Sequence, residues 1–409
     1  MLLRRLLHLC AWGALLGAPA CAKDAPAARA SDVPLFNNLG THSYPISSRV
    51  PRVQAYFDQG LRLYYGFNHA EAIRAFEHAA RLDPKCAMCH WGAAMAYGPN
   101  INLPMDSASG VQAHSHARRA LALAGEANEK ERALIRALST RFASPPPADR
   151  ARLDSAYARE MEALARRFPD DAEVQTLHAE ALMDLRPWRY WTRGGEPEPG
   201  TETLVSRLEG VIRRNPNHPG ACHFYIHAVE AAHPERAVPC AERLAALMPG
   251  AGHLVHMPGH IYIRVGRYVD AIHANEHAVH ADETYIRDQN PAFGQYTAGY
   301  YPHNYDFLAF AAAMAGRSQQ AIEAARKVSS LLPEEMLRAP GMGFLQHYRM
   351  RPLQMLVRFG RWDEILNAPA PPEGLPHARA MWHYARGRAL AAWGQVREAE
   401  AELARVRAA

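Results

Sequence analysis

Small and large apolar residues recur along this chain at intervals that are typical of paired helices. Between residues 53 and 86, small residues stand at Gly60 and Ala72, the large ring of Phe76 follows, and Pro84 comes near the end. Small residues let two antiparallel helices approach closely, a large ring fills the gap that remains, and a proline ends the second helix. The pattern therefore predicts a helical hairpin.

Later segments repeat this pattern, with a glycine in the turn between each pair of expected helices. These glycines are Gly266, Gly316, Gly360 and Gly394. A hairpin of about 34 residues is the unit of tetratricopeptide arrays. Alanine is abundant and β-branched residues are sparse, which favours helix over sheet. We therefore expect an all-α fold, a tetratricopeptide-type right-handed α-solenoid of about eight helix pairs.

Three segments interrupt the period, and each predicts an ordered loop. They span residues 98–110, 186–203 and 283–301 and are rich in Gly, Pro, Asn or aromatic residues. Long loops in compact proteins are usually functional or disordered. Aromatic residues such as Trp188 and Tyr300 favour loops that cover part of the array.

The first 22 residues predict a cleaved export signal. Two arginines precede an apolar stretch at residues 6–16, and small residues follow in a cleavage-site pattern. The apolar stretch is too short to span a bilayer. Cys21 also fits a lipoprotein anchor, although Ala18 stands where leucine is usual. We expect a periplasmic or secreted protein whose only membrane attachment would be a lipid on Cys21.

The remaining chain predicts one repeat array behind a short leader. We expect an extended N-terminal segment at 23–50 and a solenoid over 51–409. Its expected parts are N-terminal repeats at 51–216, histidine-rich central repeats at 217–335 and C-terminal repeats at 336–409.

Charge excludes one class of partner. The formal net charge is +5, with 21% charged residues and no run of five or more Lys or Arg. Nucleic-acid binding needs a clustered basic surface, so we expect no nucleic-acid partner.

Histidines are concentrated in the central repeats, where eleven of the 22 lie between residues 218 and 303. Spacings of three and four residues keep side chains on one helix face. Aligned to the repeat, six of these histidines fall on first helices, at positions that face the concave side of such arrays, whereas His273, His277 and His280 fall on a second helix. Imidazole is the commonest protein metal ligand. The predicted metal ligands are His223, His227, His253, His256, His260 and His303.

Four further residues are candidates for orienting those ligands or contacting a substrate: Glu230, Asp306, Tyr262 and Tyr305. Imidazole ligands in an exported protein favour Cu or Zn as the metal. An oxygen-dependent copper reaction and a metal-dependent hydrolysis with Glu230 as base are both compatible with this set. The pattern does not choose between these reactions.

A protein-interaction scaffold is the alternative interpretation, since repeat arrays serve many roles. The histidines would then bind a peptide in the concave groove as hydrogen-bond donors and acceptors. Few lysines stand at the inward positions, which disfavours a clamp for a peptide carboxylate. A histidine taken alone is also commonly an ordinary surface residue.

Four cysteines lie outside the predicted export signal, and they form two candidate pairs. Cys86 and Cys89 with His90 match the C-x-x-C-H motif for covalent haem c. Their place at the start of a packed helix favours a local disulfide or a dithiol over haem c. Cys222 and Cys240 lie on two facing helices of one repeat. A disulfide there would brace the helix that carries two of the candidate ligands.

Several stretches together resemble a group of exported bacterial tetratricopeptide proteins of largely uncharacterised function. The stretches are CAMCHWGAAMAYGPNIN at 86–102, HPGACHFYIHAVEAA at 218–232, AGHLVHMPGHIYIRVGRYVDA at 251–271 and YYPHNYDFL at 300–308. The resemblance covers roughly residues 50–335. It implies the repeat fold and a shared polar site at the six candidate histidines, and it supplies no reaction. Asp306 stands where many relatives would carry histidine.

Overall fold

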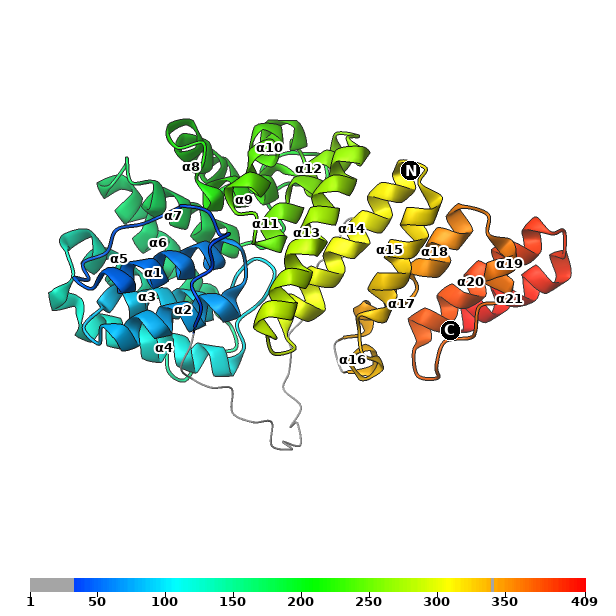
Figure 1. Cartoon of the computed structure of the whole chain (residues 1–409), viewed down its shortest axis with the longest axis horizontal. Helices are drawn as coiled ribbons and strands as arrows, with labels where there is room; N and C mark the ends of the chain where they lie inside the picture. The colour runs from blue at the N-terminus through cyan, green and yellow to red at the C-terminus, as the bar shows by residue number, and fades with distance from the viewer. Residues whose placement is uncertain (1–32, 340–341) are drawn as a thin grey trace. The chain divides into compact units, whose positions relative to one another are not determined.

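The computed structural model describes residues 33–339 and 342–409 of the chain, which form helices and no β-strand (Figure 1). The expected all-α class is confirmed, and the solenoid arrangement stays a prediction. The predicted export signal and Cys21 lie outside the described residues. The chain divides into two compact units, and the division falls between Ile261 and Tyr262, inside the predicted central segment 217–335.

The first unit begins with residues 33–50, which contain no helix and run against α1. Tyr56 donates a hydrogen bond to the carbonyl of Val33 (2.8 Å), and the amide of Tyr44 donates to Asp58 (3.0 Å). The helices that follow are α1 (Pro51–Tyr65), α2 (His69–Leu82), α3 (Ala87–Tyr97), α4 (Ser107–Ala122), α5 (Glu129–Ser139), α6 (Ala151–Arg167), α7 (Ala172–Asp184), α8 (Thr201–Arg214), α9 (Pro219–Val229), α10 (Val238–Leu247) and α11 (Gly252–His256). Short 3₁₀ turns lie at Ala124–Glu126 and Pro234–Ala237.

The second unit starts within α12 (Pro258–Arg264). Its further elements are α13 (Tyr268–Gln289), a π-helical turn (Tyr296–Tyr300), α14 (Tyr301–Met314), α15 (Ser318–Ser330), α16 (Glu334–Arg338), a 3₁₀ turn (Gly343–Leu345), α17 (Gln346–Arg349), α18 (Arg351–Arg358), α19 (Trp362–Leu366), α20 (Pro376–Ala392) and α21 (Val396–Ala408). Among the described residues, no helix combines the length and the apolar character that crossing a membrane requires.

Successive helices pack on one another within each unit, as the small-residue pattern predicts. Phe76 of α2 is 1% exposed and fills the space between α1 and α3. A methyl group added at Gly60 would stand 2.7 Å from the Phe76 ring, and one at Gly92 would stand 2.4 Å from it. The two glycines therefore make room for the ring that joins three helices.

The four expected glycine turns are present in the second unit. Gly266, Gly316, Gly360 and Gly394 have φ values of 80°, 75°, 65° and 75°, in the left-handed region that glycine adopts without a steric penalty. Each one ends a helix and lets the next begin within two residues.

Parts of the three predicted loops are helical. Residues 98–106 and 185–200 lie between helices. The loop predicted at 283–301 is wrong over residues 283–289, where α13 continues as helix to Gln289. α13 contains no glycine or proline that would end it earlier. It is capped by Asn290, which has φ 43° and is followed by Pro291.

One contact in the first unit joins elements that are distant in sequence. α1 packs on its neighbour α2 and also on α9, more than 150 residues later (Figure 1). In a strictly linear array each repeat touches only its neighbours. The end of α1 is therefore placed against the helix that carries the first candidate histidines.

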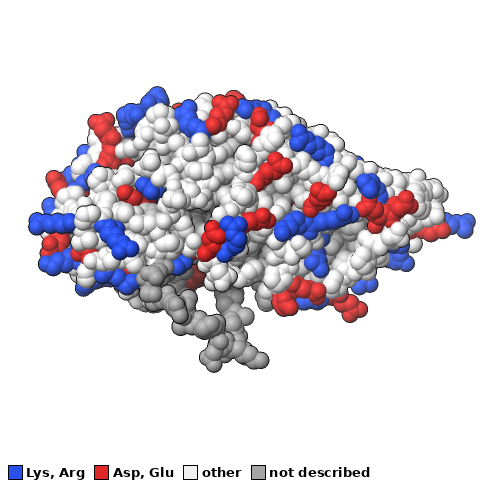
Figure 2. Space-filling view, viewed as in Figure 1, with Lys and Arg blue, Asp and Glu red and all other residues white. Residues whose placement is uncertain are grey.

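The charged side chains do not separate by sign over the described part of the face in Figure 2. Lys and Arg are interspersed with Asp and Glu there. This distribution agrees with the dispersed charge of the sequence.

We predict that Gly92→Ala lowers the free energy of unfolding by about 1–3 kcal/mol, because the added methyl overlaps the buried Phe76 ring. Urea unfolding measures the change. Gly210→Ala on α8 is the matched control, because its methyl would come no closer than 3.8 Å to an arginine nitrogen, and it should be neutral or slightly stabilising. Equal stability of wild type and Gly92→Ala would contradict the packing described for Phe76.

Candidate metal centre

The first part of the site is built on α9. His218 caps its N-terminus and Pro219 opens its first turn, where a missing N–H costs nothing. His223 and His227 follow one turn apart on one face, and Glu230 comes directly after the helix. All three side chains are buried, with His223 at 0% exposure and His227 at 2%.

The second part comes from α11 and the start of α12. His253 and His256 lie at the two ends of the short helix α11, and His260 lies in the next turn. The three are 2%, 0% and 8% exposed. The ring centroid of His253 is 5.0 Å from that of His223, and the centroid of His260 is 5.4 Å from that of His227. The first unit thus gathers five of the six predicted ligands.

The hydrogen bond of His223 fixes which of its nitrogens is free to bind. Its Nδ1 lies 2.7 Å from the carbonyl oxygen of Tyr65, at the end of α1. A carbonyl only accepts, so Nδ1 carries the hydrogen and donates it. The lone pair of the neutral ring is therefore on Nε2. Metal-binding histidines typically donate their other N–H to such an acceptor.

The Glu230 carboxylate accepts the Nδ1 hydrogens of two further histidines. Its Oε1 lies 3.1 Å from Nδ1 of His227 and its Oε2 lies 3.0 Å from Nδ1 of His260. A carboxylate accepts both N–H groups, so both imidazoles keep their lone pair on Nε2. Nε2 of His227 is buried and has no hydrogen-bond partner among the described residues. One acidic side chain thus sets two imidazoles in the form that binds metals.

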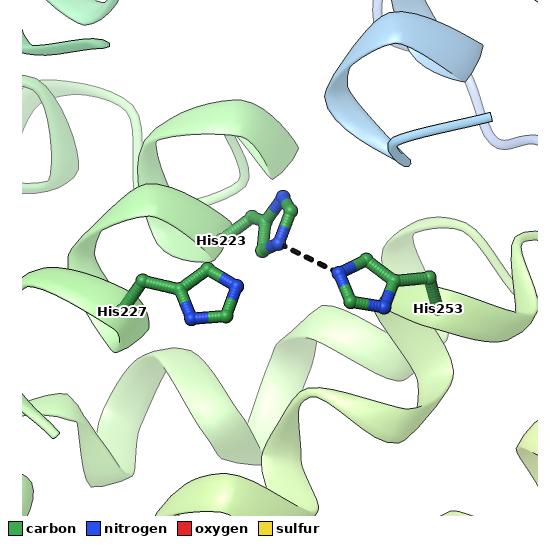
Figure 3. A group of neighbouring side chains, drawn as sticks. All are labelled: His223, His227 and His253. Carbon is green, nitrogen blue, oxygen red and sulfur yellow. Dashed lines mark hydrogen bonds between the residues drawn. The ribbon is translucent and has the colours of Figure 1, made fainter. Parts of the chain in front are cut away.

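Three imidazoles point toward one another in Figure 3: His223 and His227 from α9, and His253 from α11. One ligand nitrogen from each lies within 4.8 Å of the other two. Nε2 of His223 and Nε2 of His253 are 3.2 Å apart. Two nitrogens bound to one tetrahedral ion at about 2.0–2.1 Å would be about 3.3 Å apart. The spacing therefore fits either a shared proton or a shared cation.

Aromatic side chains enclose this group. The ring of Phe67 contacts His223 edge-on at 4.5 Å and lies nearly parallel to His253 at 5.4 Å. Phe67 has φ 56°, which is rare for a bulky residue and is found where surrounding packing imposes it. Trp188, from the predicted loop at 186–203, contacts His227 edge-on at 5.0 Å. The loop therefore covers part of the site, as its aromatic content suggests.

Burial keeps these imidazoles neutral. Burial, with the neighbouring imidazoles acting in the same direction, lowers the pKa of His223 and of His253 well below the usual value. Burial also lowers the pKa of His227, and the Glu230 carboxylate opposes that shift. Neutral rings keep the lone pairs that a metal ion requires.

The remaining predicted residues belong to the second unit and have other contacts there. His303 lies on α14, with its ring 4.5 Å from that of Phe307. Tyr305 donates to Glu283 (2.8 Å), and Tyr262 lies beneath the guanidinium of Arg267 at 4.5 Å. Asp306 is paired with Arg351 of α18.

Burial and the charge of Arg351 have opposite effects on the pKa of Asp306. Burial acts to raise the pKa of Asp306, and the Arg351 guanidinium outweighs this and holds it below the usual value. An ion pair of this kind gives Asp306 a structural role between α14 and α18.

The cysteines form one bonded pair and one unbonded pair. Cys86 and Cys89 are joined in a disulfide at the start of α3, which engages both sulfurs of the C-x-x-C-H motif. Cys222 and Cys240 are buried free thiols. A hydrogen bond with Cys240, together with burial, raises the pKa of the Cys222 thiol, so the two side chains do face each other.

Two residues that contribute to the site could not be predicted from the sequence. The carbonyl of Tyr65 orients His223, and the ring of Phe67 encloses three imidazoles, but both lie more than 150 residues before α9. A backbone carbonyl leaves no trace in a sequence. Phe67 could have been noticed only as a large apolar residue in a turn, which is an unusual place for one.

No protein-family model matches the chain, and no curated protein matches it significantly.

We predict that the chelator-treated protein loses stability as pH falls below 6.5. The unfolded chain then binds protons that the buried imidazoles exclude, so stability is present above the unfolded pKa and declines below it. The loss approaches about 1.4 kcal/mol per excluded proton for each pH unit. Urea unfolding between pH 7.5 and 5 measures it.

The variant His253→Gln should show a shallower decline, because one excluded proton is removed. His277→Gln, at an exposed position on α13, controls for loss of an imidazole as such. A decline of the same steepness in wild type and His253→Gln would contradict the neutral, buried state assigned to His253.

Proposed function

We propose that this protein binds one Cu or Zn ion through the Nε2 atoms of His223, His227 and His253. The observation that carries the proposal is the direction of the hydrogen bonds. Nδ1 of His223 and Nδ1 of His227 each face an acceptor, so the lone pair of each neutral ring is on Nε2. A purely structural cluster has no need to share this orientation.

The donor set favours these metals. Three imidazoles lie together, no thiol lies in the group, and the carboxylate of Glu230 is taken by histidine N–H groups. Imidazole suits Zn and Cu, whereas oxygen-rich sets suit Mg or Ca. Three protein ligands leave one position of a tetrahedral ion for a further ligand, as in catalytic zinc sites. When bound there, the ion would supply Lewis acidity.

Glu230 serves this site as a positioning residue. Both of its oxygens accept hydrogen bonds from imidazole N–H groups. A general base needs an oxygen directed at the proton that it removes. These contacts favour orientation of His227 and His260 over the role of base considered from the sequence.

Export remains part of the proposal. The predicted signal at 1–22 and the Cys86–Cys89 disulfide both suit an oxidising compartment. The resemblance to exported bacterial tetratricopeptide proteins points the same way. We infer a periplasmic or secreted metalloprotein.

Elemental analysis of untagged protein from a periplasm tests the proposal. We expect about one Cu or Zn per chain in the wild type and its loss in His223→Ala/His227→Ala, which lacks two of the three ligands. The matched control is His273→Ala/His277→Ala on the exposed face of α13, which should keep the metal. Wild-type protein without metal, even after incubation with Cu or Zn salts and dialysis, would refute the site.

A second variant isolates the role of Glu230. In Glu230→Gln only the amide oxygen accepts an imidazole N–H, so one histidine loses its acceptor. We expect metal affinity to fall about 10- to 100-fold, as measured by chelator competition. Glu235→Gln, at an exposed position, should bind like wild type. Unchanged affinity in Glu230→Gln would exclude the positioning role.

A further inference from the structure

A second group of titratable side chains in the first unit lines a cavity of about 600 Å³. The walls are formed by residues 41–44, the N-terminal end of α7 at 170–173, Asn215, residues 217–219 before and at the start of α9, and Leu247. None of these residues belongs to the proposed metal site. At the centre lie His42, Glu173 and His218, whose ligand atoms are within 4.8 Å of one another.

Glu173 organises this group. Its Oε1 lies 2.6 Å from Nε2 of His42 and 3.2 Å from Nε2 of His218, and its Oε2 accepts a hydrogen bond from the Tyr65 hydroxyl. Burial acts to raise the pKa of Glu173, but His218 and His42 outweigh it and hold the pKa well below its usual value. Glu173 therefore keeps its negative charge inside the protein.

The hydrogen bonds run opposite to those of the metal centre. Nδ1 of His218 accepts the backbone N–H of Ala221 at 3.1 Å, so the hydrogen of the neutral ring is on Nε2 and is donated to Glu173. That nitrogen has no lone pair for a metal ion. A metal at this group would require the N-terminal cap of α9 to break, so the geometry disfavours one.

His42 is the one member with a basic nitrogen left over. Its Nε2 is directed at the carboxylate, so the neutral ring donates there and keeps its lone pair on Nδ1. The polar contact of the His42 ring with a described residue is made by Nε2 and not by Nδ1. His42 therefore offers a hydrogen-bond acceptor at a residue that lines the cavity.

Other cavity residues add negative charge and polar groups. Lys130 neutralises Asp171, but Asp170 is exposed and has no basic partner among the described residues. Glu173 likewise has no lysine or arginine partner among the described residues. Tyr44 also lines the cavity at 6% exposure, and its hydroxyl has no hydrogen-bond partner among the described residues. Buried hydroxyls without a partner are rare and mark places where a ligand or water binds.

We propose that this cavity binds small organic cations that carry primary ammonium groups. His42 Nδ1 and the Asp170 carboxylate accept the ammonium N–H groups, and Glu173 supplies the buried negative charge that attracts the cation. A neutral molecule of the same shape would leave that charge uncompensated, and an anion would be repelled. The inference is independent of the metal centre.

Isothermal titration of the full chain with three four-carbon probes tests this proposal. We expect butane-1,4-diamine to bind at least tenfold more tightly than butane-1,4-diol, and succinate to give no binding. Added salt should weaken the diamine, because its attraction is electrostatic. Equal binding of diamine and diol would overturn the proposal.

Variants locate the binding. Asp170→Asn and His42→Gln should each weaken diamine binding at least threefold, and both change residues that are not fully buried. Glu160→Gln, on the exposed face of α6, is the matched control and should bind like wild type. Equal losses in Glu160→Gln and Asp170→Asn would show diffuse attraction to surface acids and refute the site.

The same titration also distinguishes the cavity from the metal centre as the place where the diamine binds. His223→Ala/His227→Ala should keep diamine binding whether or not the wild type holds metal. Loss of diamine binding in that variant would assign the amine to the histidine cluster and overturn the cavity as its site.

Discussion

A neutral imidazole has one N–H and one lone pair, and whichever acceptor takes the N–H decides where the lone pair points. This constraint governs the centre of the first unit. The Tyr65 carbonyl and the Glu230 carboxylate take the Nδ1 hydrogens of His223, His227 and His260. The lone pairs of the neutral rings are therefore on Nε2. At Glu173 the same rule gives the opposite outcome, because the carboxylate takes Nε2 hydrogens.

Burying a cluster of imidazoles has a cost in folding free energy. Imidazole nitrogens without partners cost about 1–3 kcal/mol each when they are removed from water. Nε2 of His227 is in that position among the described residues. The left-handed backbone of Phe67 adds strain beside it. A fold keeps features of this kind where a ligand offsets them, and a metal ion would bind the nitrogen that the protein leaves unsatisfied.

The part of this structure that sequence predicts is the part that depends on local spacing. Helix pairs, glycine turns and the shared face of His223 and His227 follow from residues a few positions apart. The long-range contacts do not. Asp306 is a candidate for orienting ligands by its place in the repeat, and nothing local indicates that it pairs with Arg351, 45 residues later. Likewise, nothing local to His42 indicates Glu173, because the contact depends on how α7 packs beside the N-terminal segment.

Tyr65 takes part in both groups of side chains with different atoms. Its carbonyl accepts from His223, and its hydroxyl donates to Glu173. A ligand at either place that shifts Tyr65 would therefore act on the contacts of the other place. If the first ligand changes the affinity for the second, the second must change the affinity for the first by the same factor, because coupling between binding sites is reciprocal. One tyrosine would then serve as the route by which occupancy of the cavity is felt at the histidines.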